Sequence, residues 1–153
     1  LAPFVSMARW FWQEDQRAGK SSRRLTILHG VSHTSQLGYQ SEMETLAADD
    51  GFDMVYVPVV SRPDQDPQYV EEMARGRLND AFRLLWNEPK LGHVDPYLPA
   101  HTRDILRQRL TVAGSAAYLC GNPGMIHDAK ERLAKQGFNT EGRESQVITE
   151  DYW

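Results

Sequence analysis

The stretch AAYLCGNPGMI, residues 116–126, contains the clearest strand-to-helix transition in the chain. Its first five residues are mostly apolar and predict a short buried strand, which ends at a glycine. Asn122 is a favoured helix cap and Pro123 suits a first helical turn, so a helix is expected to run to about Gln136. A strand that leads directly into a helix is the repeating unit of α/β folds.

The same alternation extends along the rest of the chain. Further strands are predicted at 25–31, 54–60 and 146–149, and further helices at 3–18, 39–47, 78–86 and 102–110. Pro58 lacks an N–H donor, which places its strand at or near a sheet edge. The pattern predicts one α/β domain over residues 1–153, with a mostly parallel sheet covered by helices on both faces.

Composition narrows the function classes. The 153 residues suffice for one domain, and 41% hydrophobic with 25% charged residues is typical of a globular protein. A net charge of −4 argues against a nucleic-acid or membrane-surface binder that acts through bulk charge. Cys120 is the only cysteine, so neither an internal disulfide nor a structural zinc site is expected. Without an apolar run long enough to span a membrane, we expect a soluble cytoplasmic protein.

Small and polar residues follow the predicted strands. Ser32 comes after the first strand, Ser61 and Arg62 after the second, and Gly121 and Asn122 at the end of the third. Ligands of parallel sheets bind beyond the carboxyl ends of the strands. Hydroxyl, amide and guanidinium groups at that edge favour a site for a nucleotide.

Several segments resemble the NADP-binding domain of bacterial ferredoxin–NADP⁺ reductases, in the order of that family. They are HGVSHTSQLGYQSEME (29–44), VVSR (59–62), AYLCGNPGMI (117–126) and EDYW (150–153). The opening LAPFVSM (1–7) is similar to the second half of the family's GTG-x-AP-F segment. The resemblance covers nearly the whole chain and implies a Rossmann-like fold of three layers.

The resemblance implies that Ser61 and Arg62 bind the 2′-phosphate of adenosine. A guanidinium suits this role because it is permanently charged and offers a planar set of donors to phosphate. The alternative for Arg62 is an ordinary surface arginine. Asp64 lies nearby in sequence, and an NAD-selective site would place a carboxylate near the ribose.

Arg77 matches a second phosphate-binding arginine of the family, with Arg75 as an alternative. Ser32 departs from the family pattern, because related bacterial sequences often have arginine there. A serine donates one hydrogen bond without adding charge. The neighbouring His33 compensates in part when it is protonated.

The resemblance implies a nicotinamide-facing loop made of Gly121, Asn122, Pro123 and Met125. Cys120 matches the family cysteine beside the position of hydride transfer, which makes it the catalytic candidate. Its implied role is shape and electrostatics near the nicotinamide, not nucleophilic attack. The alternative is a small buried apolar residue.

The two ends of the chain also match the family. Ala2 and Pro3 match the start of the helix beneath the pyrophosphate, and Trp153 matches a terminal aromatic residue that stacks on the flavin. The alternative for Trp153 is a terminus packed on the surface. The family binds FAD on a separate N-terminal β-barrel whose R-x-Y-[ST] motif is not found here. The first, central strand of the sheet is also missing, so we expect a C-terminal fragment of a longer reductase.

The resemblance implies an oxidoreductase that uses NADP and FAD. It would pass hydride between the two cofactors and exchange electrons with ferredoxin, a flavodoxin-like carrier or an oxygenase component. Arg103, Arg107 and Arg109 form either a basic patch for such a carrier or an ordinary solvated helix face. The alternative function is a nucleotide-binding module without catalysis. The sequence leaves the oligomeric state open.

Overall fold

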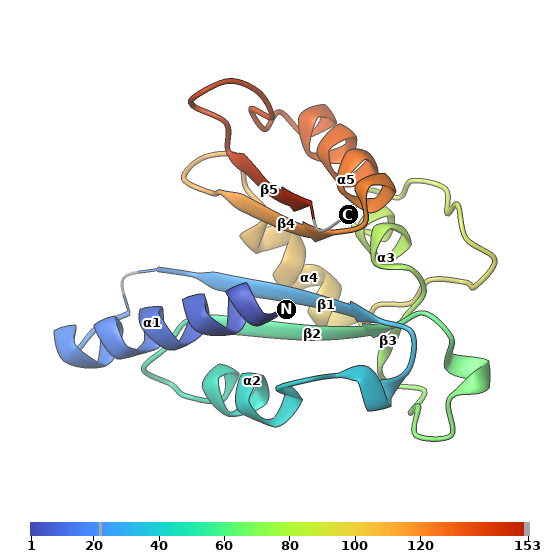
Figure 1. Cartoon of the computed structure of the whole chain (residues 1–153), viewed down its shortest axis with the longest axis horizontal. Coiled ribbons are helices and arrows are strands. Elements are labelled where there is room, and N and C mark those ends of the chain that lie inside the picture. The colour runs from blue at the N-terminus through green and yellow to red at the C-terminus, as the bar shows by residue number, and fades with distance from the viewer. Residues whose placement is uncertain (22, 152–153) are drawn as a thin grey trace.

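The computed structural model describes residues 1–21 and 23–151 and shows an α/β fold with parallel strands (Figure 1). The helices are α1 (Ala2–Ala18), α2 (Gln40–Ala47), α3 (Leu78–Leu84), α4 (Ala100–Arg109) and α5 (Pro123–Lys135). The strands are β1 (Leu25–Val31), β2 (Met54–Val60), β3 (Ala74–Arg75), β4 (Ala117–Gly121) and β5 (Val147–Asp151). Single 3₁₀ turns, η1 (Thr34–Gln36) and η2 (Pro63–Gln65), follow β1 and β2.

The strands form two separate parallel sheets. One has the order β1-β2-β3 and the other pairs β4 with β5. All of them run in the same direction across Figure 1, so their carboxyl ends point the same way. The predicted parallel α/β architecture is confirmed. It is divided between β1 and β4, where no strand of the described residues supplies the expected central position.

Strand β2 is more central than its proline suggested. It lies between β1 and β3 in the strand order, not at an edge. Strand β3, however, pairs only with Val59 and Val60, while β1 pairs with the whole of β2. Pro58 therefore lies just before the point at which β3 joins, and no described strand opposes it on that side.

Helices cover both faces of the first sheet, as predicted. Helices α1 and α2 cover one face, where Val5 and Met43 pack with Ile27. Helices α3 and α4 cover the other face, where Ala81 and Leu106 pack with the β2 side chains of opposite direction. The side chains of successive strand residues point to opposite faces, which explains why β2 contributes to both clusters.

Helix α5 covers the second sheet. Leu133 of α5 packs with Phe138 and Val147, and Phe82 of α3 reaches the same cluster. Figure 1 shows α3 beside α5 and above the first sheet. Contacts between α3 and α5 are the most extensive of those that join an element of one half to an element of the other. These two helices therefore set the relative position of the two sheets.

A largely buried group of charges, centred on the buried Arg83, lies between α3 and α5. The Arg83 side chain, 6% exposed, forms ion pairs with Asp128 of α5 and with Glu88, whose Oε2 lies 3.2 Å from Nη1. Arg132 of α5 also pairs with Glu88. Asn79 donates a hydrogen bond of 2.6 Å to Oδ2 of Asp128, the carboxylate oxygen that Arg83 does not contact. This charge cluster (Asn79, Arg83, Glu88, Asp128 and Arg132) joins the two halves by polar contacts as well as by apolar packing.

Element boundaries differ from the predictions by a few residues. Helix α1 ends at Ala18, and Gly19 adopts the left-handed conformation expected of a C-terminal glycine, with φ 64°. Helix α3 ends two residues earlier than predicted, and α4 begins two residues earlier. Strand β3 was missed because two residues carry no periodic pattern. No helix within 1–21 and 23–151 combines the length and apolar character needed to cross a membrane.

Candidate functional site

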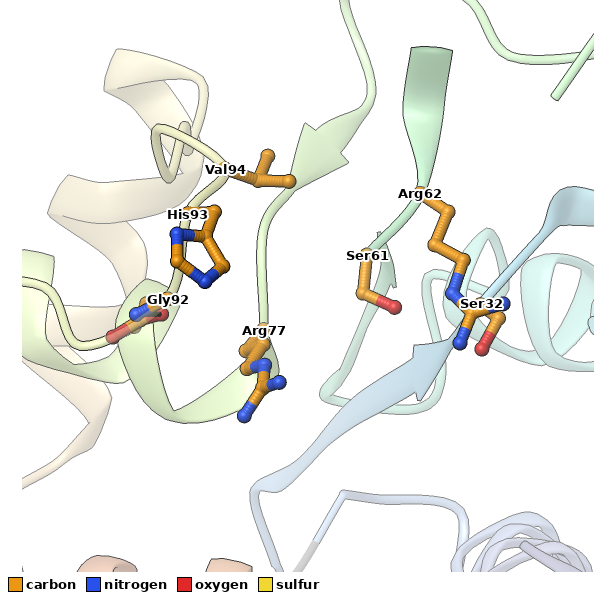
Figure 2. A pocket seen from close by; sticks show the side chains of 8 residues that line it. Ser32, Ser61, Arg62, Arg77, Gly92, His93 and Val94 are labelled. Atoms are coloured by element: carbon orange, nitrogen blue, oxygen red, sulfur yellow. Dashed lines mark hydrogen bonds between the residues drawn. The ribbon is translucent and has the colours of Figure 1, made fainter. Parts of the chain in front are cut away.

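A cavity of about 190 Å³ lies beyond the carboxyl ends of β1 and β2. It is lined by four residues singled out in the sequence, which are Ser32, Ser61, Arg62 and Arg77. It is also lined by four that were not, which are Asp80, Gly92, His93 and Val94. Figure 2 shows two sides: Ser32, Ser61 and Arg62 lie on one, and Arg77 and the 92–94 segment lie on the other.

Strand pairing brings the first side together. Beyond the last residues of β1 and β2, the pairing continues as Ser61 N–H donates to the Val31 carbonyl over 2.9 Å. Arg62 N–H then donates to the Ser32 carbonyl over 3.0 Å. The side chains after two neighbouring parallel strands therefore meet at one edge, as the sequence predicted.

The loops beyond these strands are joined by Asp66. Its carboxylate accepts hydrogen bonds from the Thr34 N–H at 2.6 Å, the Thr34 hydroxyl at 3.0 Å and the Gln68 N–H at 3.1 Å. Burial alone would raise the pKa of Asp66, but these hydrogen bonds outweigh it and lower the pKa below its ordinary value. The ionised side chain thus fixes the segment after Ser32 against the segment after Arg62.

A glycine turn places Arg77 on the second side. Gly76 is buried, has φ 105° and donates its N–H to the Val60 carbonyl. A Cβ on Gly76 would lie only 3.0 Å from the Cα of Pro96, so the turn needs glycine for both reasons. Arg77 follows as the N-cap of α3, and both Arg77 and Arg62 are exposed to solvent at the cavity.

The structure separates the alternatives for the phosphate-binding residues. Arg75 is not a lining residue: its guanidinium lies 5.1 Å from the ring centre of Tyr97, and a hydrogen bond with Tyr69 raises its pKa. Asp64 is exposed in η2 and does not line the cavity. Neither does His33, which caps η1. Of these candidates, only Ser32 and Arg77 line the cavity, and their role toward phosphate stays a prediction.

The nicotinamide-facing residues of the prediction form a second group, at the carboxyl end of β4. Asn122 caps α5 as expected, because its Oδ1 accepts the Met125 N–H at 2.9 Å. The methyl end of Met125 covers Gly121, and a Cβ at this position would collide with it. Cys120 is a partly buried free thiol in β4. None of these residues lines the cavity, and their roles toward nicotinamide stay predictions.

One hydrogen bond connects the two groups. Asn79, in the first turn of α3, donates to the Met125 carbonyl in the first turn of α5 at 3.2 Å. The helix that begins after Arg77 is thereby attached to the helix that begins after Asn122. A ligand that bridged the cavity and the β4 loop would contact the starts of two helices held in fixed relation.

Ala2 and Pro3, predicted as binding residues at the start of the chain, do not line the cavity. Ala2 and Pro3 form the first turn of α1, with Ala2 exposed. Trp153 lies outside the described residues, so its predicted stacking stays a prediction. Of the three α4 arginines, Arg107 donates to the Leu85 carbonyl and Arg109 pairs with Asp53.

A histidine–tyrosine pair lies near the start of α1. His29 Nδ1 is 2.9 Å from the Tyr56 hydroxyl. Burial, with a smaller effect from the positive amino terminus, lowers the pKa of His29 to about 4. Burial raises the pKa of Tyr56 to about 12, with the Glu44 charge adding to the effect. Both groups are therefore neutral at pH 7.

The buried His29 should make stability depend on pH. The unfolded chain takes up a proton at the ordinary pKa of 6.5, whereas the folded chain does so only near 4. The free energy of unfolding should therefore fall by up to about 3 kcal/mol as the pH drops from 7 to 4, because the loss begins near pH 6.5 and is nearly complete at pH 4. Urea unfolding at stepped pH values tests this: His29→Gln should flatten the slope, and the exposed control His101→Gln should not. Parallel slopes for His29→Gln and the unsubstituted chain would contradict it.

The additional lining residues come from segments with weak sequence signals. Asp80 and Arg77 are three positions apart, a spacing that puts both on one side of a helix. Gly92 and His93 belong to the Pro- and Gly-rich loop 87–99, which has no periodic pattern. The available signal was a histidine that follows a glycine in a loop. The path of the loop decides whether His93 reaches Arg62 and Arg77, and the sequence does not show that path.

Comparisons with known proteins identify the family and the fold of the chain. A family model described as "Oxidoreductase NAD-binding domain" matches residues 1–131. A comparison with curated proteins gave no match. The fold is similar to the crystal structure of a ferredoxin NADP+ reductase from Neisseria gonorrhoeae with bound FAD and NADP, with a TM-score of 0.58.

That similarity covers 84% of this chain and 44% of the reductase chain, at 19% sequence identity. The chain thus spans less than half the length of that protein, and at this identity the similarity shows the fold alone. It confirms the predicted Rossmann-like architecture. The family match extends over most of the chain, so the chain belongs to the oxidoreductase NAD-binding domain family.

Proposed function

We propose that this chain binds NADP(H) and serves as the nicotinamide-nucleotide half of a ferredoxin–NADP⁺ reductase-like flavoenzyme. The observation that carries the proposal is the cavity that gathers Ser32, Ser61, Arg62 and Arg77 from three separate segments. Two permanent positive charges and two hydroxyl groups suit a phosphate monoester, which is the group that distinguishes NADP from NAD.

The cavity chemistry fits this ligand. The single carboxylate among the lining residues, Asp80, is 1% exposed, and each of its oxygens accepts a backbone N–H. It is therefore not free to bind a ribose hydroxyl in the manner of an NAD-selective carboxylate. Arg62 and Arg77 are both exposed, so their donors are available to a ligand from solvent.

The chain's own residues would orient the nucleotide. Ser61 and Arg62 would hold the 2′-phosphate from one side of the cavity and Arg77 from the other. The loop from Gly121 to Pro123 would place the nicotinamide at the carboxyl end of β4, where glycine permits close backbone approach. Cys120 would border that position from within the strand, as a group that shapes the site.

The redox chemistry belongs to the cofactors. When bound, NADP and FAD would supply that chemistry: hydride transfer between them, and single-electron exchange between the flavin and ferredoxin, a flavodoxin-like carrier or an oxygenase component. FAD would be bound mainly by residues outside this chain. This chain would itself supply nucleotide binding and orientation. Because it spans only 44% of the similar reductase, a nucleotide-binding module without catalysis is the second candidate.

Calorimetric titration with 2′,5′-ADP and 5′-AMP tests the proposal. Two guanidinium groups on one phosphate should favour 2′,5′-ADP by at least about a hundredfold, since hydrogen bonds to charged groups contribute about 1.5–3 kcal/mol each. Equal affinities would contradict an NADP site. Addition of FAD and ferricyanide with NADPH separates the two candidates: turnover by this chain alone would contradict the module without catalysis.

A further inference from the structure

We propose that His93 is a third residue that binds the 2′-phosphate, and that Asp80 is the positioning residue that holds it at the cavity. This inference rests on the proposed NADP site and adds a residue to it. Neither residue was predicted as part of the site, and both line the same cavity as Arg62 and Arg77.

His93 lies in a position that supports this role. It is exposed, lines the cavity, and lies on the side of Arg77, facing the side that carries Ser61 and Arg62 (Figure 2). A phosphate held between Arg62 and Arg77 would therefore be within the space that His93 borders. An imidazole always carries at least one N–H donor, which suits a phosphate oxygen.

Asp80 attaches the loop that carries His93 to α3. Asp80 Oδ1 accepts the N–H of Leu91 at 2.7 Å, and Oδ2 accepts the N–H of Gly92 at 2.9 Å. Both bonds are partly buried, and Asp80 itself is 1% exposed. A buried carboxylate that binds two consecutive N–H groups fixes the backbone immediately before His93.

Gly92 packs closely against side chains at the start of α3. A Cβ on Gly92 would lie 2.7 Å from Asp80 Oδ2 and 3.5 Å from the Cδ of Arg77. The loop thus packs directly on the carboxylate and on the aliphatic part of the Arg77 side chain. Any larger residue at 92 would displace the loop, the carboxylate or the arginine.

The loop is also attached after His93, where it pairs with β3. Arg75 of β3 and Tyr97 exchange two backbone hydrogen bonds of 3.0 Å. Lys90 pairs with Asp95 across the turn that carries His93. His93 therefore lies in a short segment held at both ends, which limits the conformational entropy that it would lose on binding a ligand.

The charges around the segment favour an anion in the cavity that His93 borders. The Asp80 carboxylate is occupied by the two N–H groups and lies 3.9 Å from the Arg83 guanidinium. The Asp95 carboxylate is paired with Lys90. Arg62 and Arg77 supply the net positive charge of the cavity, so a phosphate is the ligand class that completes it.

The test compares the affinities for 2′,5′-ADP and 5′-AMP in variants of the full chain. His93→Ala should weaken 2′,5′-ADP binding by about threefold to tenfold and leave 5′-AMP binding unchanged, because one exposed hydrogen bond to a charged group is lost. His93→Gln, which keeps an N–H donor, should retain most of the affinity. His101→Ala, an exposed histidine on α4, is the matched control and should change neither affinity.

Asp80 is tested by the ratio of the two affinities, which a loss of general stability would not alter. Asp80→Ala should reduce the preference for 2′,5′-ADP as much as His93→Ala does, and Asp80→Asn, which keeps one acceptor, should restore part of it. Gly92→Ala should also reduce the preference for 2′,5′-ADP. Circular dichroism confirms that each variant is folded.

The outcomes distinguish this inference from the proposed function. A His93→Ala variant that binds 2′,5′-ADP as tightly as the unsubstituted chain would overturn the role of His93, and the NADP site would stand. An Asp80→Ala variant with an unchanged ratio would overturn the positioning role. If the unsubstituted chain itself shows no preference for 2′,5′-ADP, the proposed function fails and this inference fails with it.

Discussion

The Arg83→Ala variant should have a free energy of unfolding about 3–5 kcal/mol lower than that of the unsubstituted chain. The Arg83 side chain is 6% exposed and forms ion pairs with Asp128 and Glu88, which are 16% and 19% exposed. Removal of the guanidinium leaves these carboxylates in a poorly solvated place. The expected loss is large because the remaining charges lose their partner, whatever the net contribution of the intact cluster.

The remaining positive charge cannot compensate. Arg132 already pairs with Glu88, and its Nε lies 3.9 Å from Asp128. With Arg83 absent, one guanidinium would face both carboxylates, and the buried Asp80 would also lose its nearest arginine. Like-charge repulsion then adds to the cost of desolvation.

The position of the cluster defines a second readout. Because α3 and α5 make the main contact between the two halves, Arg83→Ala should also weaken the docking of the β4–β5 sheet. Amide hydrogen exchange in β4 and β5 should then increase more than exchange in β1 and β2. Equal increases in both sheets would contradict a role in joining the halves.

A matched control separates burial from charge. Arg17 also forms an ion pair, with Glu14 at 2.7 Å, but its side chain is 75% exposed. Arg17→Ala should shift the urea midpoint little, because exposed pairs contribute little to stability. Arg83→Lys keeps the charge but lacks the planar fork that contacts Asp128 and Glu88 together, so its midpoint should fall between the two. A midpoint for Arg83→Ala as close to the original as that of Arg17→Ala would contradict the prediction.

Much of the fold could be predicted from the sequence because its signals are local. The β-branched run 54–60 and the apolar run 117–120 identify strands by composition alone. Gly19 and Asn122 occupy the helix ends that their conformational preferences suggest. The edge that holds Ser61 and Arg62 also follows from the sequence, because parallel strands bring their carboxyl ends together.

The features that could not be predicted depend on long-range contacts. Asp80 and Arg83 have the spacing of ordinary charges on a helix surface, and only the tertiary structure buries them. The partner of Arg83 on α5 is 45 positions away. His93 reaches the cavity because two N–H groups of its loop bind Asp80, and no periodic pattern encodes that path. The division of the sheet between β1 and β4 likewise appears only when the strands are placed.

The double variant Arg62→Ala/Arg77→Ala should lose the preference for 2′,5′-ADP over 5′-AMP almost completely. Each guanidinium offers charged hydrogen bonds of about 1.5–3 kcal/mol to the same phosphate, so the two together account for a loss of at least about a hundredfold in affinity. Each single variant should lose about tenfold or more. Binding of 5′-AMP should change less than about twofold, because that ligand lacks the phosphate which the two arginines contact.

Dependence on salt gives the variant series a physical signature. Arg62 and Arg77 are exposed, so their attraction for phosphate is screened by ions, and the unsubstituted chain should bind 2′,5′-ADP more weakly as ionic strength rises. The double variant should show a much smaller dependence. Arg143→Ala is the control, since Arg143 is an exposed arginine just before β5, at the amino edge of its sheet. If Arg143→Ala weakened binding as much as Arg62→Ala, the effect would come from net charge, and the assignment of the phosphate to this cavity would be wrong.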